Sequence, residues 1–235
     1  MICLIPARGG SKGILRKNLA LLQGRPLLEY SIRAAQSSKL VTQVMVSTED
    51  AEIEQVARAL GASVLMRPAE LAEDHTTVLD VLLHATRFEA GADIICLLQP
   101  VNPFVTWKHI DGCLVTLSNE MQWESVQTVT PVPHNHHLIN QRMIQKAGST
   151  DFWFPDMKRE HPQKQSKPPA LSYGGCVALR VDAARHQDTC FPQPSQPILI
   201  DPPYSHDIDT PYELALAEAM LAAGLVKLPH MENIR

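Results

Sequence analysis

The sequence lacks the long hydrophobic runs and the excess of charge of one sign that mark membrane proteins and nucleic-acid-binding proteins. No apolar run approaches the roughly 18 to 20 residues that a membrane-spanning helix needs. The formal net charge is −4, whereas a surface for nucleic acids or anionic lipids needs a broad basic face. We therefore expect no nucleic-acid partner and no membrane partner.

The sequence also lacks the pattern of a signal peptide at its start and the cysteine spacing of a disulfide framework. Arg8 ends the first apolar run before a signal-peptide pattern can form. The five cysteines are scattered, odd in number and without C-x-x-C spacing, which favours reduced thiols. Both features indicate a cytoplasmic protein. The length of 235 residues, with 45% hydrophobic and 20% charged residues, predicts one domain over residues 1–235 with a small appendage.

The strongest positive signal is a loop of glycines and basic residues directly after the first apolar run. Residues 7–18 read A-R-G-G-S-K-G-I-L-R-K-N and contain three glycines and four cations. Such a loop lets backbone N–H groups and cationic side chains approach phosphate oxygens together. The spacing fits neither G-x-G-x-x-G nor G-x-x-x-x-G-K-[ST]. The loop therefore predicts a phosphate site of another kind, the alternative being a solvated basic surface loop.

Apolar runs alternate with segments of helical period along the first hundred residues. The pattern predicts strands near 1–6, 43–48, 62–66 and 93–99, and helices near 26–38, 50–60 and 77–90. Repeated βα units indicate an α/β fold, a Rossmann-like, mostly parallel sheet flanked by helices. The basic loop then lies at the carboxyl end of the first strand, where open α/β sheets bind ligands.

A pair of aspartates precedes the last predicted helix. Thr210-Pro211-Tyr212-Glu213 is a capping box with proline in the first turn, which predicts a helix over about 211–224. Asp207 and Asp209 are spaced i and i+2, so an extended backbone places them on one side. Paired carboxylates suit Mg²⁺. The alternative is that the acidic residues only stabilise the helix N-terminus.

Residues 131–172 interrupt the alternation of strands and helices. They contain six prolines, and Phe152, Trp153 and Phe154 are consecutive aromatics. We do not expect this stretch to add to the central sheet. It is either an ordered surface excursion or, because aromatics beside charged residues suit an interface, a protruding arm that contacts another subunit.

Five sequence blocks together resemble the CMP-sialic acid synthetases, the acylneuraminate cytidylyltransferases. The loop has the form R-G-G-S-K-G-x-x-x-K-N after I-P-A, like the N-terminal signature of that family. V-S-T-E-D, R-P-A-E-L-A, L-L-Q-P and D-I-D-T follow in the family's order, at 46–50, 67–72, 97–100 and 207–210. The resemblance implies a nucleotidyltransferase-type fold. It also implies an enzyme that transfers CMP from CTP to the anomeric hydroxyl of a nine-carbon 2-keto sugar acid, a nonulosonic acid, with release of pyrophosphate.

The resemblance also implies roles for individual residues. The catalytic cations would be Arg8, Lys12 and Lys17. The nucleotide would be bound by Ala7, Arg8, Gly10, Ser11, Lys12, Asn18 and Arg67. Asp207 and Asp209 would bind the cofactor Mg²⁺. Residues 131–172 would form a dimerisation arm that closes the active site of a second subunit, so a homodimer is expected.

The sequence departs from the family at positions where the family binds the sugar. Residues 99–105 read Q-P-V-N-P-F-V where the family has Q-P-T-S-P-L-R, and Gly174 stands where the family commonly has the asparagine of N-G-A. The predicted sugar-binding residues are Gln99, Asn102 and Gly174. Because the nucleotide side is intact, we expect CTP together with an acid other than N-acetylneuraminate, such as legionaminic or pseudaminic acid.

Three alternatives stay open at this point. The chain could be a nucleotide-binding module whose altered sugar site is inactive. It could activate an octulosonic acid such as Kdo. It could use another nucleoside triphosphate such as GTP, because discrimination between bases depends on hydrogen bonds that a sequence does not locate.

Overall fold

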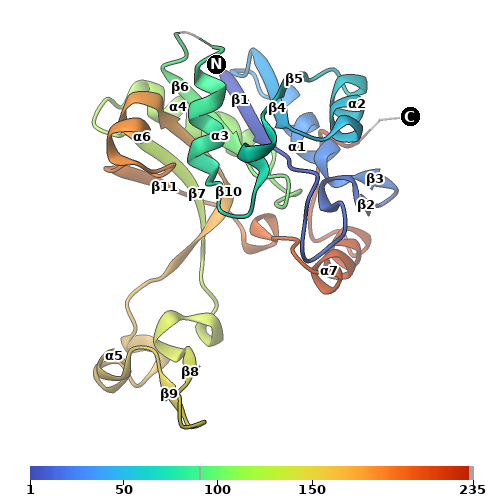
Figure 1. Ribbon diagram of the computed structural model, residues 1–235. Coiled ribbons are helices and arrows are strands. Elements are labelled where there is room, and N and C mark those ends of the chain that lie inside the picture. Colours follow the sequence, from blue (N-terminus) through green and yellow to red (C-terminus); the bar gives the residue numbers. More distant parts are fainter. Residues whose placement is uncertain (90, 233–235) are drawn as a thin grey trace.

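A seven-stranded sheet forms the centre of the computed structural model, which describes residues 1–89 and 91–232 (Figure 1). In spatial order its strands are β11 (Ser195–Leu199), β7 (Ser125–Pro131), β10 (Leu171–Arg180), β6 (Ile94–Leu98), β1 (Ile2–Pro6), β4 (Gln43–Thr48) and β5 (Ser63–Met66). β10 runs antiparallel to its neighbours β6 and β7, and the other pairings are parallel. The expected mostly parallel sheet is confirmed.

Helices cover both faces of this sheet. They are α1 (Leu27–Gln36), α2 (Ala51–Ala59), α3 (Val78–Thr86), α4 (Trp107–Asn119), α6 (Val181–Gln187) and α7 (Pro211–Ala222). α1, α2 and α4 share a core with Cys3 and Ile5 of β1, whereas α3 and α6 pack on the opposite face with Leu4. β1 is therefore apolar at consecutive positions because both of its faces are buried. α7 packs beside α1 in a third cluster that includes Phe104.

The predicted elements of the first hundred residues are confirmed as β1, β4, β5, β6, α1, α2 and α3, and the last predicted helix is α7. Residue 90, the last of the helix predicted over 77–90, lies outside the described residues. The caps explain these boundaries. Asp50 accepts hydrogen bonds from the first turn of α2, Gly61 with φ +80° follows its end, and Thr210 forms the expected capping box with Glu213.

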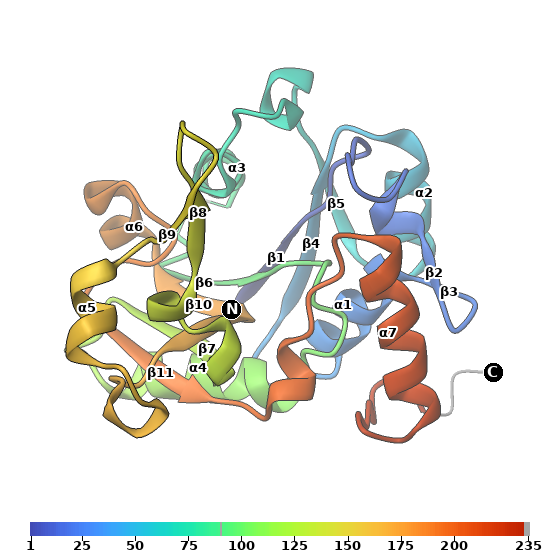
Figure 2. The ribbon, with the colours of Figure 1, turned by 90° about the horizontal axis from the view of Figure 1, so that it is seen from below.

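The segment between β7 and β10 extends away from the sheet (Figure 1). It contains β8 (Arg142–Ile144), which pairs antiparallel with β9 (Thr150–Phe152), and the short helix α5 (Pro155–Glu160). The guanidinium of Arg142 lies 4.6 Å from the centre of the Phe152 ring. Seen from below, α5, β8 and β9 lie on the side where β7, β10 and β11 are, and α7 lies on the other side (Figure 2). A role in dimerisation stays a prediction.

Two further features concern the cysteines and the helix lengths. All five cysteines are buried free thiols, and Cys96 and Cys176 have their sulfur atoms 3.6 Å apart. Within residues 1–89 and 91–232, every helix is too short or too polar to cross a lipid bilayer.

Gly175→Ala is expected to destabilise the protein strongly. Gly175 has φ +93°, and a Cβ atom there would lie 2.5 Å from the Cβ of Asn102. Atomic overlap therefore adds to a backbone strain of about 1–3 kcal/mol. Gly148→Ala is the matched control, because Gly148 has φ +83° but open space around it. Urea titration should give a clearly larger loss for Gly175→Ala, and equal losses would contradict the proposed overlap.

Candidate functional site

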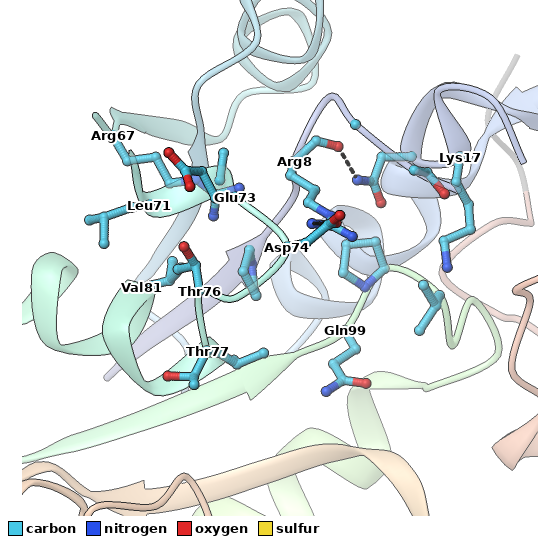
Figure 3. Close-up of a pocket in the computed structure, with 18 residues that line it drawn as sticks. Arg8, Lys17, Arg67, Leu71, Glu73, Asp74, Thr76, Thr77, Val81 and Gln99 are labelled. Atoms are coloured by element: carbon cyan, nitrogen blue, oxygen red, sulfur yellow. Dashed lines mark hydrogen bonds and ion pairs between the residues drawn. The ribbon is translucent and has the colours of Figure 1, made fainter. Parts of the chain in front are cut away.

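A cavity of about 320 Å³ opens at the carboxyl ends of β1 and β6. Three segments line it: the basic loop after β1, residues 67–81, and Gln99 to Val101 after β6. In Figure 3, Arg67 lies on one side of the cavity and Lys17 on the other, with Arg8 and Asp74 between them. The cavity thus lies where parallel α/β sheets bind ligands, and its volume is at the lower end of the range of about 300–1,000 Å³ that is usual for small-molecule sites.

The basic loop contributes five of the predicted residues to this lining. They are Arg8, Gly10, Ser11, Lys17 and Asn18. The Asn18 side chain is buried and donates a hydrogen bond of 2.8 Å to the carbonyl of Arg8, which ties the two ends of the loop together. Gly10 is exposed, and nothing lies within 4 Å of a Cβ atom built on it. The backbone there is accessible to a ligand.

Ala7 and Lys12 lie outside this lining. Ala7 is fully buried, and its N–H donates to the carbonyl of Ser47 at 2.9 Å, so it extends the pairing of β1 with β4. Lys12 is exposed, and its Nζ lies 2.6 Å from a carboxylate oxygen of Asp74. The same carboxylate accepts a hydrogen bond of 3.1 Å from Arg8. The hydrogen bond from Lys12 is the largest cause that lowers the pKa of Asp74. Lys12 therefore lies at the rim of the cavity.

Arg67 is the cation on the opposite wall. Its side chain is 3% exposed, and its Nε and Nη2 atoms lie 3.2 and 2.9 Å from one carboxylate oxygen of Glu49. Burial lowers the pKa of Arg67, and the charge of Glu49 opposes this shift. Because both hydrogen bonds to Glu49 use one edge of the guanidinium, the remaining N–H groups of Arg67 are available to a ligand.

The two predicted metal ligands lie next to the basic loop. Lys17, which lines the cavity, forms an ion pair with Asp209. A Cβ atom on Gly13 would lie 2.0 Å from the carbonyl oxygen of Asp209, so the loop and the aspartate segment are in direct contact. The pKa of Asp207 is raised to about 6, first because surrounding protein atoms remove part of its hydration and second because Asp209 is negative.

A divalent cation suits this pair of carboxylates. Within the described part of the chain, no group of three or more His, Cys, Asp or Glu side chains could hold a metal. A cation on Asp207 and Asp209 would therefore take its other ligands from phosphate oxygens and water, as Mg²⁺ commonly does. The like charges that raise the pKa of Asp207 would be relieved by such a cation.

The predicted sugar contacts lie in two different environments. Gln99 lines the cavity. Asn102 is buried, and its amide lies 3.5 Å from the carbonyl of His206, so it supports the segment that carries Asp207. At Gly174, a Cβ atom would lie 2.8 Å from a methyl group of Ile200 and 2.9 Å from the Oγ1 of Thr128. The space that a larger side chain would need at Gly174 is thus filled.

Sequence reasoning missed several residues of the site. Glu49 belongs to the block V-S-T-E-D, to which no role was given, and Asp74 follows the block R-P-A-E-L-A by two residues. Thr76 and Thr77 also line the cavity at the start of α3. Thr77 forms a capping box with Asp80, and this T-V-L-D pattern was a readable signal for the start of the helix.

The fold is that of the nucleotidyltransferases. It matches CMP:2-keto-3-deoxy-manno-octonic acid synthetase complexed with CTP with a TM-score of 0.72, at 19% identity over 95% of this chain and 98% of that chain. It matches 4-diphosphocytidyl-2C-methyl-D-erythritol synthase from Anaerococcus prevotii with a TM-score of 0.62, at 12% identity over 94% and 95% of the two chains.

A model of the cytidylyltransferase family matches residues 2–184, so the chain belongs to this family. The N-acylneuraminate cytidylyltransferase of Escherichia coli O18:K1:H7 is 35% identical over 130 residues, 55% of this chain and 31% of the relative. The CMP-N,N'-diacetyllegionaminic acid synthase of Legionella pneumophila is 29% identical over 228 residues, 94% of this chain and 96% of the relative. The match to the Escherichia coli enzyme spans about a third of that enzyme's length. These relatives confirm the resemblance to the CMP-sialic acid synthetases.

Gly13→Ala is expected to lower the melting temperature, because the new methyl group would overlap the carbonyl of Asp209 and separate the loop from the aspartate segment. Overpacking of this kind should lower Tm by roughly 3–10 °C. Gly10→Ala is the control on the same loop, because the space around Gly10 is open. Thermal unfolding followed by circular dichroism should separate the two variants, and a Tm for Gly13→Ala equal to that of Gly10→Ala would contradict the described contact.

Asp207→Asn is expected to stabilise the metal-free protein near neutral pH. A carboxyl whose pKa is raised to about 6 stabilises the fold only while it is protonated, and this contribution is lost as the pH rises through 6. Calorimetry should give a Tm for Asp207→Asn that is higher than wild type by roughly 2 °C at pH 7.5. Near pH 4 the two proteins should melt together. A difference in Tm that does not change with pH would contradict the raised pKa.

Proposed function

We propose that the protein transfers CMP from CTP to the anomeric hydroxyl of a nonulosonic acid, giving a CMP-sugar and pyrophosphate. The observation that carries this proposal is the contact between Lys17 of the basic loop and Asp209 beside one cavity. That contact joins a phosphate-binding loop to a pair of possible metal ligands. Membership of the cytidylyltransferase family supports CTP as the donor, and the names of the Escherichia coli and Legionella relatives support the class of sugar.

The loop supplies the charge that nucleotidyl transfer needs. The hydroxyl oxygen of the sugar forms a bond to the α-phosphorus, and the bond from that phosphorus to the departing pyrophosphate breaks. Negative charge develops on the phosphate oxygens, and Arg8, Lys12 and Lys17 stabilise it. Lys12 exchanges Asp74 for a phosphate oxygen when CTP binds, because their ion pair is exposed and therefore weak. Arg67 contacts the nucleoside end from the opposite wall.

We propose that Mg²⁺ binds to Asp207 and Asp209. When bound there, it would neutralise phosphate charge and would lower the pKa of the attacking hydroxyl. Asn102 holds the backbone of this segment through the carbonyl of His206, and the N–H of Ile208 donates to the carbonyl of Val101 at 2.9 Å. His206 itself stacks on Phe104 with 5.9 Å between ring centres. These contacts keep the two carboxylates beside the loop.

The acid that accepts CMP is proposed to differ from N-acetylneuraminate. The departures at Val101, Asn102 and Val105 support this, and so does the match over nearly the whole chain to a legionaminic acid synthase. Asn102 and Val105 are buried, so their effect on the sugar is through the shape of the backbone that carries Gln99. An octulosonic acid is the second candidate, because the fold resembles an octonic acid synthetase.

The segment between β7 and β10 is proposed as the dimerisation arm of a homodimer. It exposes four large apolar side chains to solvent, Leu138, Ile144, Trp153 and Phe154, which are 42%, 80%, 56% and 44% exposed. Exposed aromatic residues at the end of a protruding segment are typical of an interface. Gel filtration with light scattering should give twice the mass of one chain, and a monomer at micromolar concentration would contradict this part of the proposal.

The activity is tested by pyrophosphate release from CTP with Mg²⁺ and a panel of 2-keto sugar acids. Release should occur only with the matching nonulosonic acid. Lys12→Ala and Asp209→Asn should each lower kcat/KM by about 100-fold or more, because the first removes a positive charge that stabilises the transition state and the second removes a ligand of the proposed Mg²⁺. Arg185→Ala is the control, because Arg185 lies on α6 and pairs with Asp182.

Three outcomes would contradict the proposal. Activity that survives both substitutions would show that Lys12 and Asp209 do not belong to the active site. Turnover with an octulosonic acid alone, or with GTP in place of CTP, would change the substrate. Binding of CTP without turnover of any acid would indicate a nucleotide-binding module.

A further inference from the structure

Two acidic residues directly after β4 contact the basic loop, and the first of them also contacts Arg67. We call Glu49 and Asp50 the acidic clamp. They end the block V-S-T-E-D, to which neither the sequence nor the proposed reaction gives a role. Both side chains are largely shielded from solvent, with exposures of 20% and 21%.

Glu49 contacts both walls of the cavity at once. One of its carboxylate oxygens accepts the backbone N–H of Gly9 at 2.7 Å. The other oxygen accepts Nε and Nη2 of the nearly buried Arg67 at 3.2 and 2.9 Å. All three are hydrogen bonds to a charged group, which are the stronger kind. The carboxylate therefore fixes the distance between the start of the basic loop and Arg67.

Asp50 anchors the other side of the same loop. Its carboxylate oxygens lie 2.8 and 2.9 Å from Nη2 of Arg16, and one of them also accepts the N–H groups of Glu52 and Ile53 at the start of α2. A Cβ atom on Gly9 would lie 2.5 Å from Asp50, so the loop passes over the clamp without space between them. The clamp thus connects the loop to a helix that packs on the sheet.

We infer that Glu49 is a positioning residue that holds the start of the basic loop and Arg67 at the spacing one nucleotide requires. This inference rests on the proposed use of CTP. Without the carboxylate, the Gly9 N–H loses its acceptor, and the buried guanidinium of Arg67 loses its counter-charge and must turn toward the cavity or solvent. Both walls would then leave the geometry that contacts the phosphates and the nucleoside together.

Glu49→Gln removes the negative charge of the side chain but keeps its size and shape. The glutamine amide has one acceptor oxygen and one NH₂ group, whereas the carboxylate of Glu49 offers an acceptor to each wall. In Glu49→Gln, the NH₂ group must face either the Gly9 N–H or the guanidinium of Arg67, and both of these are donors. The substitution is nearly isosteric, so it leaves the packing around β4 unchanged.

The test measures CTP binding by calorimetry in the full-length protein, together with the separate kcat and KM values for CTP. Glu49→Gln should weaken CTP binding by 10-fold or more and raise KM for CTP by a similar factor, with kcat at saturating CTP within threefold of wild type. The matched control is Glu54→Gln on α2, which loses the ion pair with Arg58 at 2.9 Å and should keep the affinity of wild type. Glu49→Asp, which keeps the charge but is one methylene shorter, should bind CTP more tightly than Glu49→Gln.

A double variant tests whether Glu49 acts through Arg67. The loss of CTP affinity in Glu49→Gln with Arg67→Gln should be less than the product of the two single losses. Wild-type CTP affinity in Glu49→Gln would overturn the inference, as would a lower Tm with unchanged affinity, which would mean a purely structural role. If Glu49→Gln does not fold, Glu49→Asp carries the test, and equal CTP affinity in Glu49→Asp and wild type would overturn the inference.

The outcome is separate from that of the proposed function. CTP binding by wild type without turnover of any sugar acid would contradict the proposed function. The role of Glu49 would then be decided by comparing the CTP affinities of wild type and Glu49→Gln. Turnover by wild type, together with wild-type CTP affinity and KM in Glu49→Gln, would contradict only the role of Glu49.

Discussion

Four cations on one short loop repel one another, and carboxylates from three distant segments hold them in place. Arg8 and Lys12 face Asp74, which precedes α3, whereas Arg16 faces Asp50 at the start of α2. Lys17 faces Asp209, which precedes α7. Each carboxylate belongs to a segment fixed by a packed helix, so the shape of the loop depends on the fold of the whole chain.

The same arrangement explains how the site can accept a polyanion. Asp74 and Lys12 are exposed, and exposed ion pairs contribute only about 0–1 kcal/mol. A triphosphate with several charges can replace Asp74 at Arg8 and Lys12. The pairs on the inner side, Arg67 with Glu49 and Lys17 with Asp209, involve nearly buried cations. The site therefore combines buried cations on its inner side with exposed ion pairs at its outer rim.

Much of the fold could be predicted because the first βα units follow simple patterns. β1, β4 and β6 are apolar runs, α1 to α3 have helical period, and α2 and α3 have clear side-chain caps. β7, β10 and β11 were missed for physical reasons. β7 has only two valines among polar residues. β10 contains the pair Gly174-Gly175 at an irregularity in the register, and β11 includes Pro197 at the edge of the sheet. Tertiary pairing decides such strands, and local propensity does not.

The site could be predicted where a motif carries the function and could not where distant segments meet. The basic loop and the pair Asp207 and Asp209 are readable in sequence, and they lie together in the structure. The contact of Glu49 with both walls was not readable, because it depends on the neighbouring positions of β1, β4 and β5 in the sheet. Asn102 and Gly174 lie inside the protein, which spacing alone did not indicate.

The most direct test of the central claim is a crystal structure of the protein with CTP and Mn²⁺ in place of Mg²⁺. The anomalous signal of manganese should lie at Asp207 and Asp209, with the triphosphate in contact with Arg8, Lys12 and Lys17 and the cytidine on the side of Arg67. A nucleotide bound away from the basic loop, or a metal bound away from the two aspartates, would contradict the account.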